Sequence, residues 1–186
     1  MGKVIIGMTM SLDGFINDRN GEVSRLYPDL EALDKTDMLQ EEIKNTGAVV
    51  MGRHAFNMAD DPDWFAGNYE FQVPILVLTH TPPAIHPKET DRLKIIFVTD
   101  GIRGAVRQAR EWAGSKDVMV IGGASTFQQC IDADLYDEIR IGIMPVLLGS
   151  GLRLFDNIDT KQVSLEKMKV IESTSGRTDI IFRVKK

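Results

Sequence analysis

One apolar run of the sequence ends in residues whose types suit the binding of phosphate. The stretch Ala48–Met51 stops at Gly52, and Arg53 and His54 follow where a short helix is expected to begin. A helix start favours anions through its free N–H groups, and arginine donates paired hydrogen bonds to phosphate, to which His54 adds a contact. The stretch therefore predicts a phosphate site. The alternative interpretation is a glycine turn that leaves both side chains exposed.

A glycine pair follows a second apolar run. Val118–Ile121 ends at Gly122 and Gly123, and Ser125 and Thr126 belong to the helix pattern that comes next. Glycine permits backbone angles with φ > 0 and lets a ligand approach the main chain, and the two hydroxyl groups add donors. This loop is predicted to cradle phosphate. The alternative is that the glycines only allow a strand and a helix to pack tightly.

A third polar strand end, Thr79-His80, follows the apolar run that begins at Pro74. The ends of parallel strands meet at one edge of a sheet, where open α/β sheets bind their ligands. Three such loops suit one extended ligand with several phosphate groups. The sequence therefore predicts a dinucleotide site.

Two common nucleotide motifs do not fit. Gly47 and Gly52 have the spacing of the Walker loop, but Arg53-His54 replaces the lysine and hydroxyl residue that this motif requires. The stretch Gly149–Leu154 lacks the third glycine and the strand–helix junction of the dinucleotide fingerprint. We therefore exclude a nucleoside triphosphatase of the Walker type.

The elements expected to position these loops alternate between strands and helices. The apolar strands are typical of a parallel sheet covered by helices, whereas two C-terminal segments around Thr174-Ser175-Gly176 indicate an antiparallel hairpin. We predict an α/β fold with a mixed sheet, parallel in the centre and antiparallel at the C-terminal edge. The expected strands are Val4–Met10, Ala48–Met51, Pro74–Thr79, Ile95–Thr99, Val118–Ile121, Glu138–Val146, Ser164–Ser173 and Arg177–Val184, and the expected helices are Thr36–Thr46, stopped by Gly47, the segment from Ile102 to Ala113, and one after Gly123.

Composition limits the class of protein. The 186 residues are 43% hydrophobic and 26% charged, which predicts one soluble globular domain over residues 1–186. The net charge of −5 argues against a nucleic-acid partner. Cys130 is the single cysteine and the three histidines lie far apart, so we expect no disulfide and no metal site. No long apolar segment or signal-peptide pattern occurs, so we expect no membrane partner and a cytoplasmic location.

Five short stretches in this order resemble the dihydrofolate reductase fold, over roughly residues 3 to 184. Val49–His54 and Val120–Gly123 carry the general likeness, and Met10–Gly14, Ala59–Pro62 and Met144–Gly149 resemble the reductase domain of bacterial riboflavin biosynthesis. The resemblance implies a three-layer sandwich and an NADPH-dependent reductase that transfers hydride to a pyrimidine- or pterin-like small molecule. The family role is that of a 5-amino-6-(5-phosphoribosylamino)uracil reductase. Relatives in this family are commonly homodimers, so a homodimer is expected.

The resemblance also implies which residues bind the cofactor. Arg53 and His54, after Gly52, would hold the 2′-phosphate, and Thr79 and His80 would lie beside the adenine ribose. The nicotinamide would lie near Met10, Asp13 and Ile16, and the pyrophosphate would be cradled by the loop that contains Ile121, Gly122, Gly123, Ala124, Ser125 and Thr126.

The substrate side departs from the family pattern. Ile121 stands where the riboflavin reductases carry a glutamate, and residues 63–68 lack the arginine that follows Asp60-Asp61-Pro62 in that family. Candidate catalytic carboxylates are Asp13, Asp37 and Asp61, although each also fits a turn or a helix start. Two alternatives therefore stay open: a dihydrofolate reductase-like enzyme of another substrate, and a non-catalytic NADPH-binding module.

Overall fold

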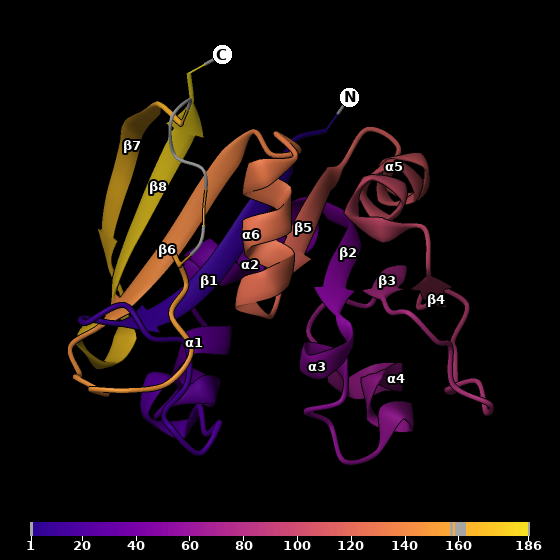
Figure 1. Cartoon of the computed structure of the whole chain (residues 1–186), viewed down its shortest axis with the longest axis horizontal. Helices are drawn as coiled ribbons and strands as arrows, with labels where there is room; N and C mark the ends of the chain where they lie inside the picture. Colours follow the sequence, from indigo (N-terminus) through magenta and orange to yellow (C-terminus); the bar gives the residue numbers. More distant parts are fainter. Residues whose placement is uncertain (1, 157, 159–162, 186) are drawn as a thin grey trace.

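Eight strands form one sheet in the order β4-β3-β2-β5-β1-β6-β8-β7 (Figure 1). The computed structural model describes residues 2–156, 158 and 163–185. The strands are β1 (Val4–Ser11), β2 (Thr46–Gly52), β3 (Ile75–Leu78), β4 (Ile95–Val98), β5 (Asp117–Ile121), β6 (Glu138–Met144), β7 (Leu165–Glu172) and β8 (Thr178–Val184). The helices are α1 (Leu30–Asp34), α2 (Asp37–Asn45), α3 (Arg53–Phe56), α4 (Phe65–Asn68), α5 (Gly101–Ala113) and α6 (Ala124–Asp132), with the 3-10 turns η1 (Ser24–Leu26), η2 (Pro62–Trp64) and η3 (Thr174–Gly176).

Strand direction confirms the predicted mixed sheet. The six strands from β4 to β6 in the sheet order are parallel to one another, β8 is antiparallel to β6, and β7 is antiparallel to β8. The carboxyl ends of β1, β2, β3 and β5 therefore lie at one edge. Within the described ranges, no helix combines the length and the apolar character needed to cross a membrane.

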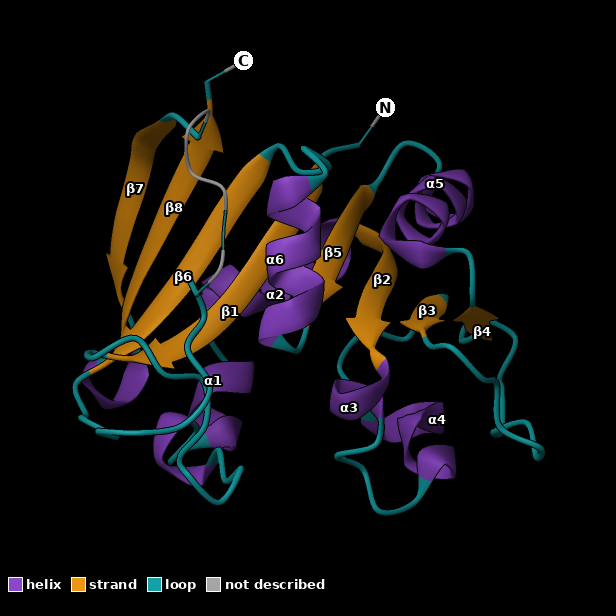
Figure 2. Ribbon diagram, in the orientation of Figure 1, coloured by secondary structure: helices purple, strands orange, loops and turns teal. Residues whose placement is uncertain are grey.

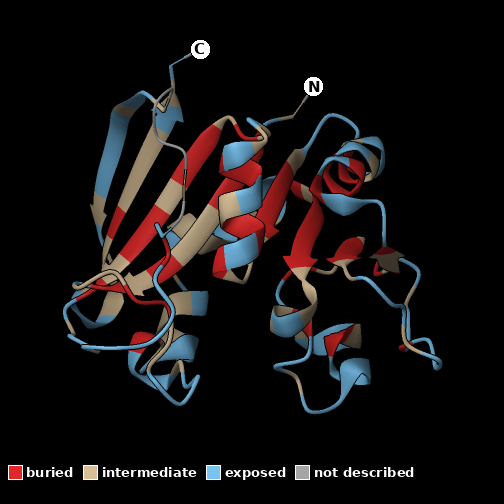
Figure 3. Ribbon diagram, in the orientation of Figure 1, coloured by how far each residue is buried: buried red, intermediate tan, exposed pale blue. Residues whose placement is uncertain are grey.

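Helices cover both faces of the sheet, which gives the three layers (Figure 2). Alternate residues of a strand point to opposite faces, so Ile6 of β1 packs in the cluster that contains α5 and α6, and Ile5 packs in the cluster that contains Phe56 and Phe65. Leu39 and Ile43 of α2 join this second cluster. The central strands are buried on both faces (Figure 3), which explains their uninterrupted apolar sequences.

The helix predicted for Thr36–Thr46 forms as Asp37–Asn45, and it ends just before Gly47 as expected. Thr36 caps α2 by accepting a hydrogen bond from the Leu39 N–H, and the Thr46 hydroxyl donates to the Glu42 carbonyl at 2.7 Å. Gly47, directly after the cap, also belongs to β2, where an added Cβ would stand 2.8 Å from backbone atoms of Ala113 in α5. This glycine therefore also allows close packing of α5 on the sheet, a contact that the sequence pattern did not indicate.

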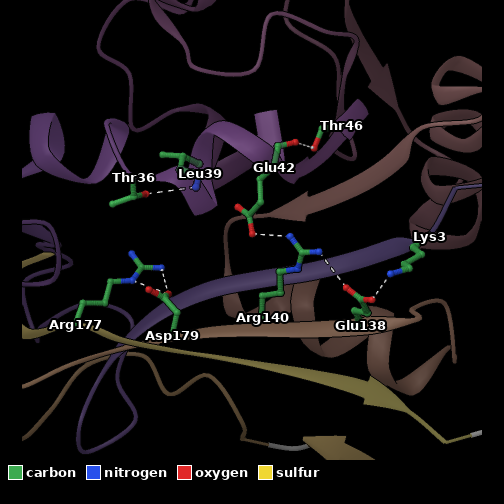
Figure 4. Close-up of polar contacts among 9 residues, drawn as sticks. All are labelled: Lys3, Thr36, Leu39, Glu42, Thr46, Glu138, Arg140, Arg177 and Asp179. Carbon is green, nitrogen blue, oxygen red and sulfur yellow. Dashed lines mark hydrogen bonds and ion pairs between the residues drawn. The ribbon is translucent and has the colours of Figure 1, made fainter. Parts of the chain in front are cut away.

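A chain of ion pairs ties α2 to the sheet (Figure 4). Glu42 of α2 binds Arg140 of β6 at 2.7 Å, Arg140 binds Glu138 at 3.0 Å, and Glu138 also pairs with Lys3. Burial alone would raise the pKa of Glu138, but the hydrogen bonds from Lys3 and Arg140 outweigh it and hold the pKa below its ordinary value. Each carboxylate in the chain is thus neutralised where it leaves water.

Candidate functional site

The two glycine loops are in direct contact at the carboxyl edge of the sheet. A Cβ added at Gly52 would lie 2.6 Å from the Thr126 hydroxyl and 3.7 Å from the Gly122 carbonyl oxygen. A Cβ added at Gly122 would lie 2.5 Å from the Cβ of Ala55. The loops after β2 and β5 therefore form one continuous surface, because neither glycine carries a side chain at the point of contact.

The glycine pair starts a nine-residue helix. Gly122 and Gly123 have φ of 89° and 80°, values that L side chains rarely adopt, and Gly123 is the residue before α6. Ala124 and Thr126 are buried, whereas Ser125 is exposed and its hydroxyl accepts a hydrogen bond from Gln129. The first N–H groups of α6 have no partner within the helix itself, as at every helix start.

Arg53 lies against aromatic rings with part of its guanidinium unsatisfied. Its Cζ is 5.3 Å from the centre of the Phe97 ring and 5.8 Å from that of Phe56. Among the described residues, nothing accepts a hydrogen bond from its buried Nη1. Buried guanidinium nitrogens are normally hydrogen-bonded, so Nη1 lacks an acceptor that an anionic group would supply. His54 is exposed beside it.

The end of β3 lies next to Arg53. Leu78 pairs with Gly52 in the sheet register, so Thr79 and His80 leave the sheet beside the Arg53 loop. The Thr79 hydroxyl donates to the Thr81 carbonyl at 3.0 Å, and His80 is exposed. The structure thus brings three of the predicted loops together, in the order β3, β2, β5 along the edge.

The loop after β1 is held by Asp13. The Ser11 hydroxyl donates to its carboxylate at 2.6 Å, and the backbone N–H groups of Leu148 and Gly149 donate at 3.1 and 2.8 Å. The Ser11 hydrogen bond and these backbone donors lower the pKa of Asp13 from 3.8 to about 2. Asp13 is therefore ionised at neutral pH, where a carboxylate can accept protons or orient donors but has no proton to give.

The other members of this loop and the other candidate acids lie on separate elements. Met10 is half-buried at the end of β1, and Ile16 is buried in the core. Asp37 is exposed in the first turn of α2, and Asp61 caps the 3-10 turn η2 by accepting from the Asp63 N–H at 2.9 Å. The described structure does not gather the three candidate catalytic carboxylates into one cluster.

Three aromatic residues that could have bordered a flat ligand mainly pack against one another. The Phe65 ring stacks on Phe56 with 4.7 Å between centroids, and it lies 5.1 Å from Tyr69 and 5.6 Å from Trp64. Phe65 is buried, and Trp64 is 45% exposed. The cluster holds α4 against α3.

The structure also contains charged groups that the sequence analysis did not single out. Arg177, just before β8, and Asp179 of β8 form a buried ion pair, and Glu138 and Arg140 belong to the chain that binds α2. In each case oppositely charged residues stand two apart in an expected strand, and this spacing places both on the same face. This spacing of opposite charges was the signal in the sequence that could have predicted both ion pairs.

A groove among the described residues lies away from this edge. It has a volume of about 550 Å³, and Lys3, Arg110, Met168 and Arg183 are among its lining residues. None of the predicted site residues lines it. The described part of the chain holds no cluster of three or more His, Cys, Asp or Glu side chains able to bind a metal ion.

The strand order, the two covering layers and the loops at the carboxyl edge define a dihydrofolate reductase-like α/β protein. Dihydrofolate reductase of Enterococcus faecalis, complexed with NADP(H) and RAB-propyl, matches all of this chain and 98% of its own with a TM-score of 0.61 and 15% identity. More specifically, the chain belongs to the RibD C-terminal domain family, whose model matches residues 2–182.

Two further proteins resemble nearly the whole chain. A putative riboflavin biosynthesis protein from Shewanella sp. PV-4 superposes with a TM-score of 0.79 at 22% identity, over 99% of each chain. The uncharacterized protein YyaP of Bacillus subtilis (strain 168) is 29% identical over 97% of this chain and 94% of its own length. The first likeness supports the fold, and the family model supports the membership.

Replacing Asp13 should destabilise the protein in a pH-dependent way. Asp13→Asn has one acceptor oxygen in place of two, so it loses part of the tether to Leu148 and Gly149. Because the folded pKa is depressed, the contribution of Asp13 is complete above pH 3.8 and is lost as the pH falls toward about 2. Urea unfolding of the unmodified protein and of Asp13→Asn should show a difference in free energy of unfolding at pH 6 that shrinks below about pH 4. The control Asp91→Asn, at an exposed position, should change the free energy of unfolding little at either pH. A free-energy difference for Asp13→Asn that does not change with pH would contradict the role of Asp13.

Proposed function

We propose that this protein is an NADPH-dependent reductase that transfers hydride to a pyrimidine- or pterin-like small molecule. The observation that carries the proposal is the contact of the Gly52 and Gly122 loops at the carboxyl edge, since one extended dinucleotide could touch both. Family membership and the NADP(H) named for the Enterococcus relative support the same cofactor. The family role, reduction of 5-amino-6-(5-phosphoribosylamino)uracil, is the proposed reaction.

The residues of the edge fit the parts of such a cofactor. Arg53 and His54 would hold the 2′-phosphate, for which the unsatisfied Nη1 of Arg53 is the available donor. Thr79 and His80 would flank the ribose, and the loop from Ile121 to Thr126 would bind the pyrophosphate. Met10, Ile16 and the loop held by Asp13 would border the nicotinamide, which supplies the hydride when bound.

The chain's own contribution to the reaction would be positioning and proton delivery. Hydride transfer depends mainly on holding two carbons at near-attack distance, so the rigid loop held by Asp13 serves the first task. Asp37 and Asp61 are the proposed proton donors. An ionised Asp13 would act through the geometry of its loop rather than by giving up a proton.

Arg53→Ala should separate the two nicotinamide cofactors. Loss of a charge-assisted contact to the 2′-phosphate should weaken NADPH binding by roughly tenfold or more and leave NADH binding nearly unchanged. Titration calorimetry measures both affinities. Arg103→Ala, at an exposed position on α5, is the matched control and should change neither. Equal losses for both cofactors would refute the assignment of Arg53.

A non-catalytic NADPH-binding module is the second candidate function. It is favoured by Ile121 at the position of the family's glutamate and by the lack of an arginine in residues 63–68. We expect NADPH to be oxidised in the presence of a pyrimidine or pterin substrate. The decrease in absorbance of the reduced nicotinamide measures this reaction. Tight NADPH binding without turnover of any pyrimidine, pterin or quinone substrate would favour the module.

We also propose a homodimer formed through the edge strand β7. Leu165, Met168 and Val170 of this strand are 38%, 49% and 51% exposed, and an apolar sheet edge calls for a cover. Light scattering should give twice the chain mass of 20.8 kDa. Val170→Lys should yield the single-chain mass while NADPH binding stays intact. A single-chain mass for the unmodified protein would rule the dimer out.

The cytoplasmic location stays a prediction.

A further inference from the structure

A buried ion pair lies outside the proposed coenzyme loops. Nε and Nη2 of Arg177 lie 2.8 and 2.7 Å from the same oxygen, Oδ1 of Asp179 (Figure 4). The side chains are 13% and 6% exposed. Taking two charges out of water costs free energy that one such contact only partly offsets, so the pair contributes little net stability. A role in binding would explain why charged groups occupy this position.

Both members of the pair have unused hydrogen-bonding capacity. Among the described residues, the buried Oδ2 of Asp179 has no partner, although buried polar atoms are normally satisfied in folded proteins. The contacts of Arg177 with Asp179 use Nε and Nη2 and leave Nη1 out. Asp179 therefore holds the guanidinium through one edge and leaves the rest of the fork available to another acceptor.

Gly142 sets the position of this guanidinium. A Cβ added at Gly142 would lie 2.4 Å from Nε, Cζ and Nη2 of Arg177, so the cation rests directly on the backbone of β6. In the sheet register Gly142 stands between Thr9 of β1 and Asp179 of β8. The guanidinium is thus one strand away from β1, whose end leads into the loop held by Asp13.

Arg177 lies on the face of the sheet that α2 covers. Arg140, two residues before Gly142 on β6, binds Glu42 of α2, and alternate strand residues share a face. This is the side on which Asp37, one of the proposed proton donors, is carried by α2. A substrate lying between β1 and α2 would meet Arg177 at its outer end.

The cover over Arg177 has one anchored and one lightly held part. A cavity of about 10 Å³, room for about one water molecule, is lined by Arg177, Met144, Leu26 and Leu33 among others. Leu26 of η1 is 1% exposed and anchors its part of the cover in the core, whereas α1 buries none of its residues and its Leu30 is 63% exposed. A segment with as few buried apolar contacts as α1 opens at low free-energy cost. Displacement of the cover would let a ligand reach the guanidinium.

We propose that Arg177, held over Gly142 by Asp179, donates hydrogen bonds to an oxygen acceptor of the substrate, either a ring carbonyl or a phosphate. The inference rests on the proposed function, because it places the substrate between α2 and β1 beside the coenzyme. It also supplies a cation that residues 63–68 do not provide. Arg177 is then a specificity-determining residue, and Asp179 is its positioning residue.

Gly142→Ala tests this role without removing either charge. The added methyl group meets only the far end of a flexible side chain, so the strand should fold while the guanidinium is pushed away. We expect the affinity for 5-aminouracil or for ribose 5-phosphate to fall by about tenfold or more, measured by calorimetry with and without NADP⁺. Loss for the first probe identifies a ring carbonyl, and loss for the second identifies a phosphate.

A second variant removes the pair with its charge balance kept. Arg177→Met combined with Asp179→Asn should lose the same probe, whereas Arg183→Met with Glu166→Gln, an exposed pair that joins β8 to β7, should bind it normally. Unchanged affinity of Gly142→Ala for both probes, or no binding of either probe to the unmodified protein, would overturn the inference. NADPH affinity, measured separately, should be equal in all variants. A failure of the unmodified protein to bind NADPH would reject the proposed coenzyme and not the role of Arg177.

Discussion

The carboxyl edge of this sheet depends on a close approach of two backbone loops. β2 and β5 are parallel neighbours, so Gly52 and Gly122 leave the sheet side by side, and neither position has room for a methyl group. Any side chain there would push the loop after β2 away from the start of α6. The surface that could receive a dinucleotide therefore exists only while both residues stay glycine. The Arg53 guanidinium takes its place on Phe97 as part of the same arrangement.

Much of the sheet could be predicted from the sequence because its signals are local. Apolar runs bounded by glycine indicated the strands, and Thr36 indicated the start of α2. The end of α2 before Gly47 was predicted, but the close contact of Gly47 with Ala113 was not, since it joins residues far apart along the chain. The ion pair of Glu42 with Arg140 was missed for the same reason. Long-range pairing follows from strand order, which local patterns do not contain. The grouping of the Gly52, Thr79 and Gly122 loops could be predicted because parallel strands share one edge.

Charge is distributed unevenly over the two faces of the sheet. The face under α5 and α6 is apolar, whereas the face under α2 carries Glu138 and Arg140 on β6, and Arg177 and Asp179 at the start of β8. Every carboxylate named here lies against a cation, so the charges can persist in a largely dry layer. The pair of Arg140 with Glu42 fixes the height and tilt of α2 more strictly than an apolar contact would, because hydrogen bonds are directional. The wall of the proposed substrate site is thereby made rigid.

Gly142 has an evolutionary consequence. The loops proposed for the coenzyme come from β2, β3 and β5, whereas the guanidinium that rests on Gly142 belongs to the β6–β8 side of the sheet. If Arg177 binds the substrate as proposed, a substitution at that single codon would change substrate affinity and leave the loops proposed for the coenzyme intact. On the same proposal, descendants of this scaffold would gain new substrates through β6 alone and inherit the coenzyme loops unchanged.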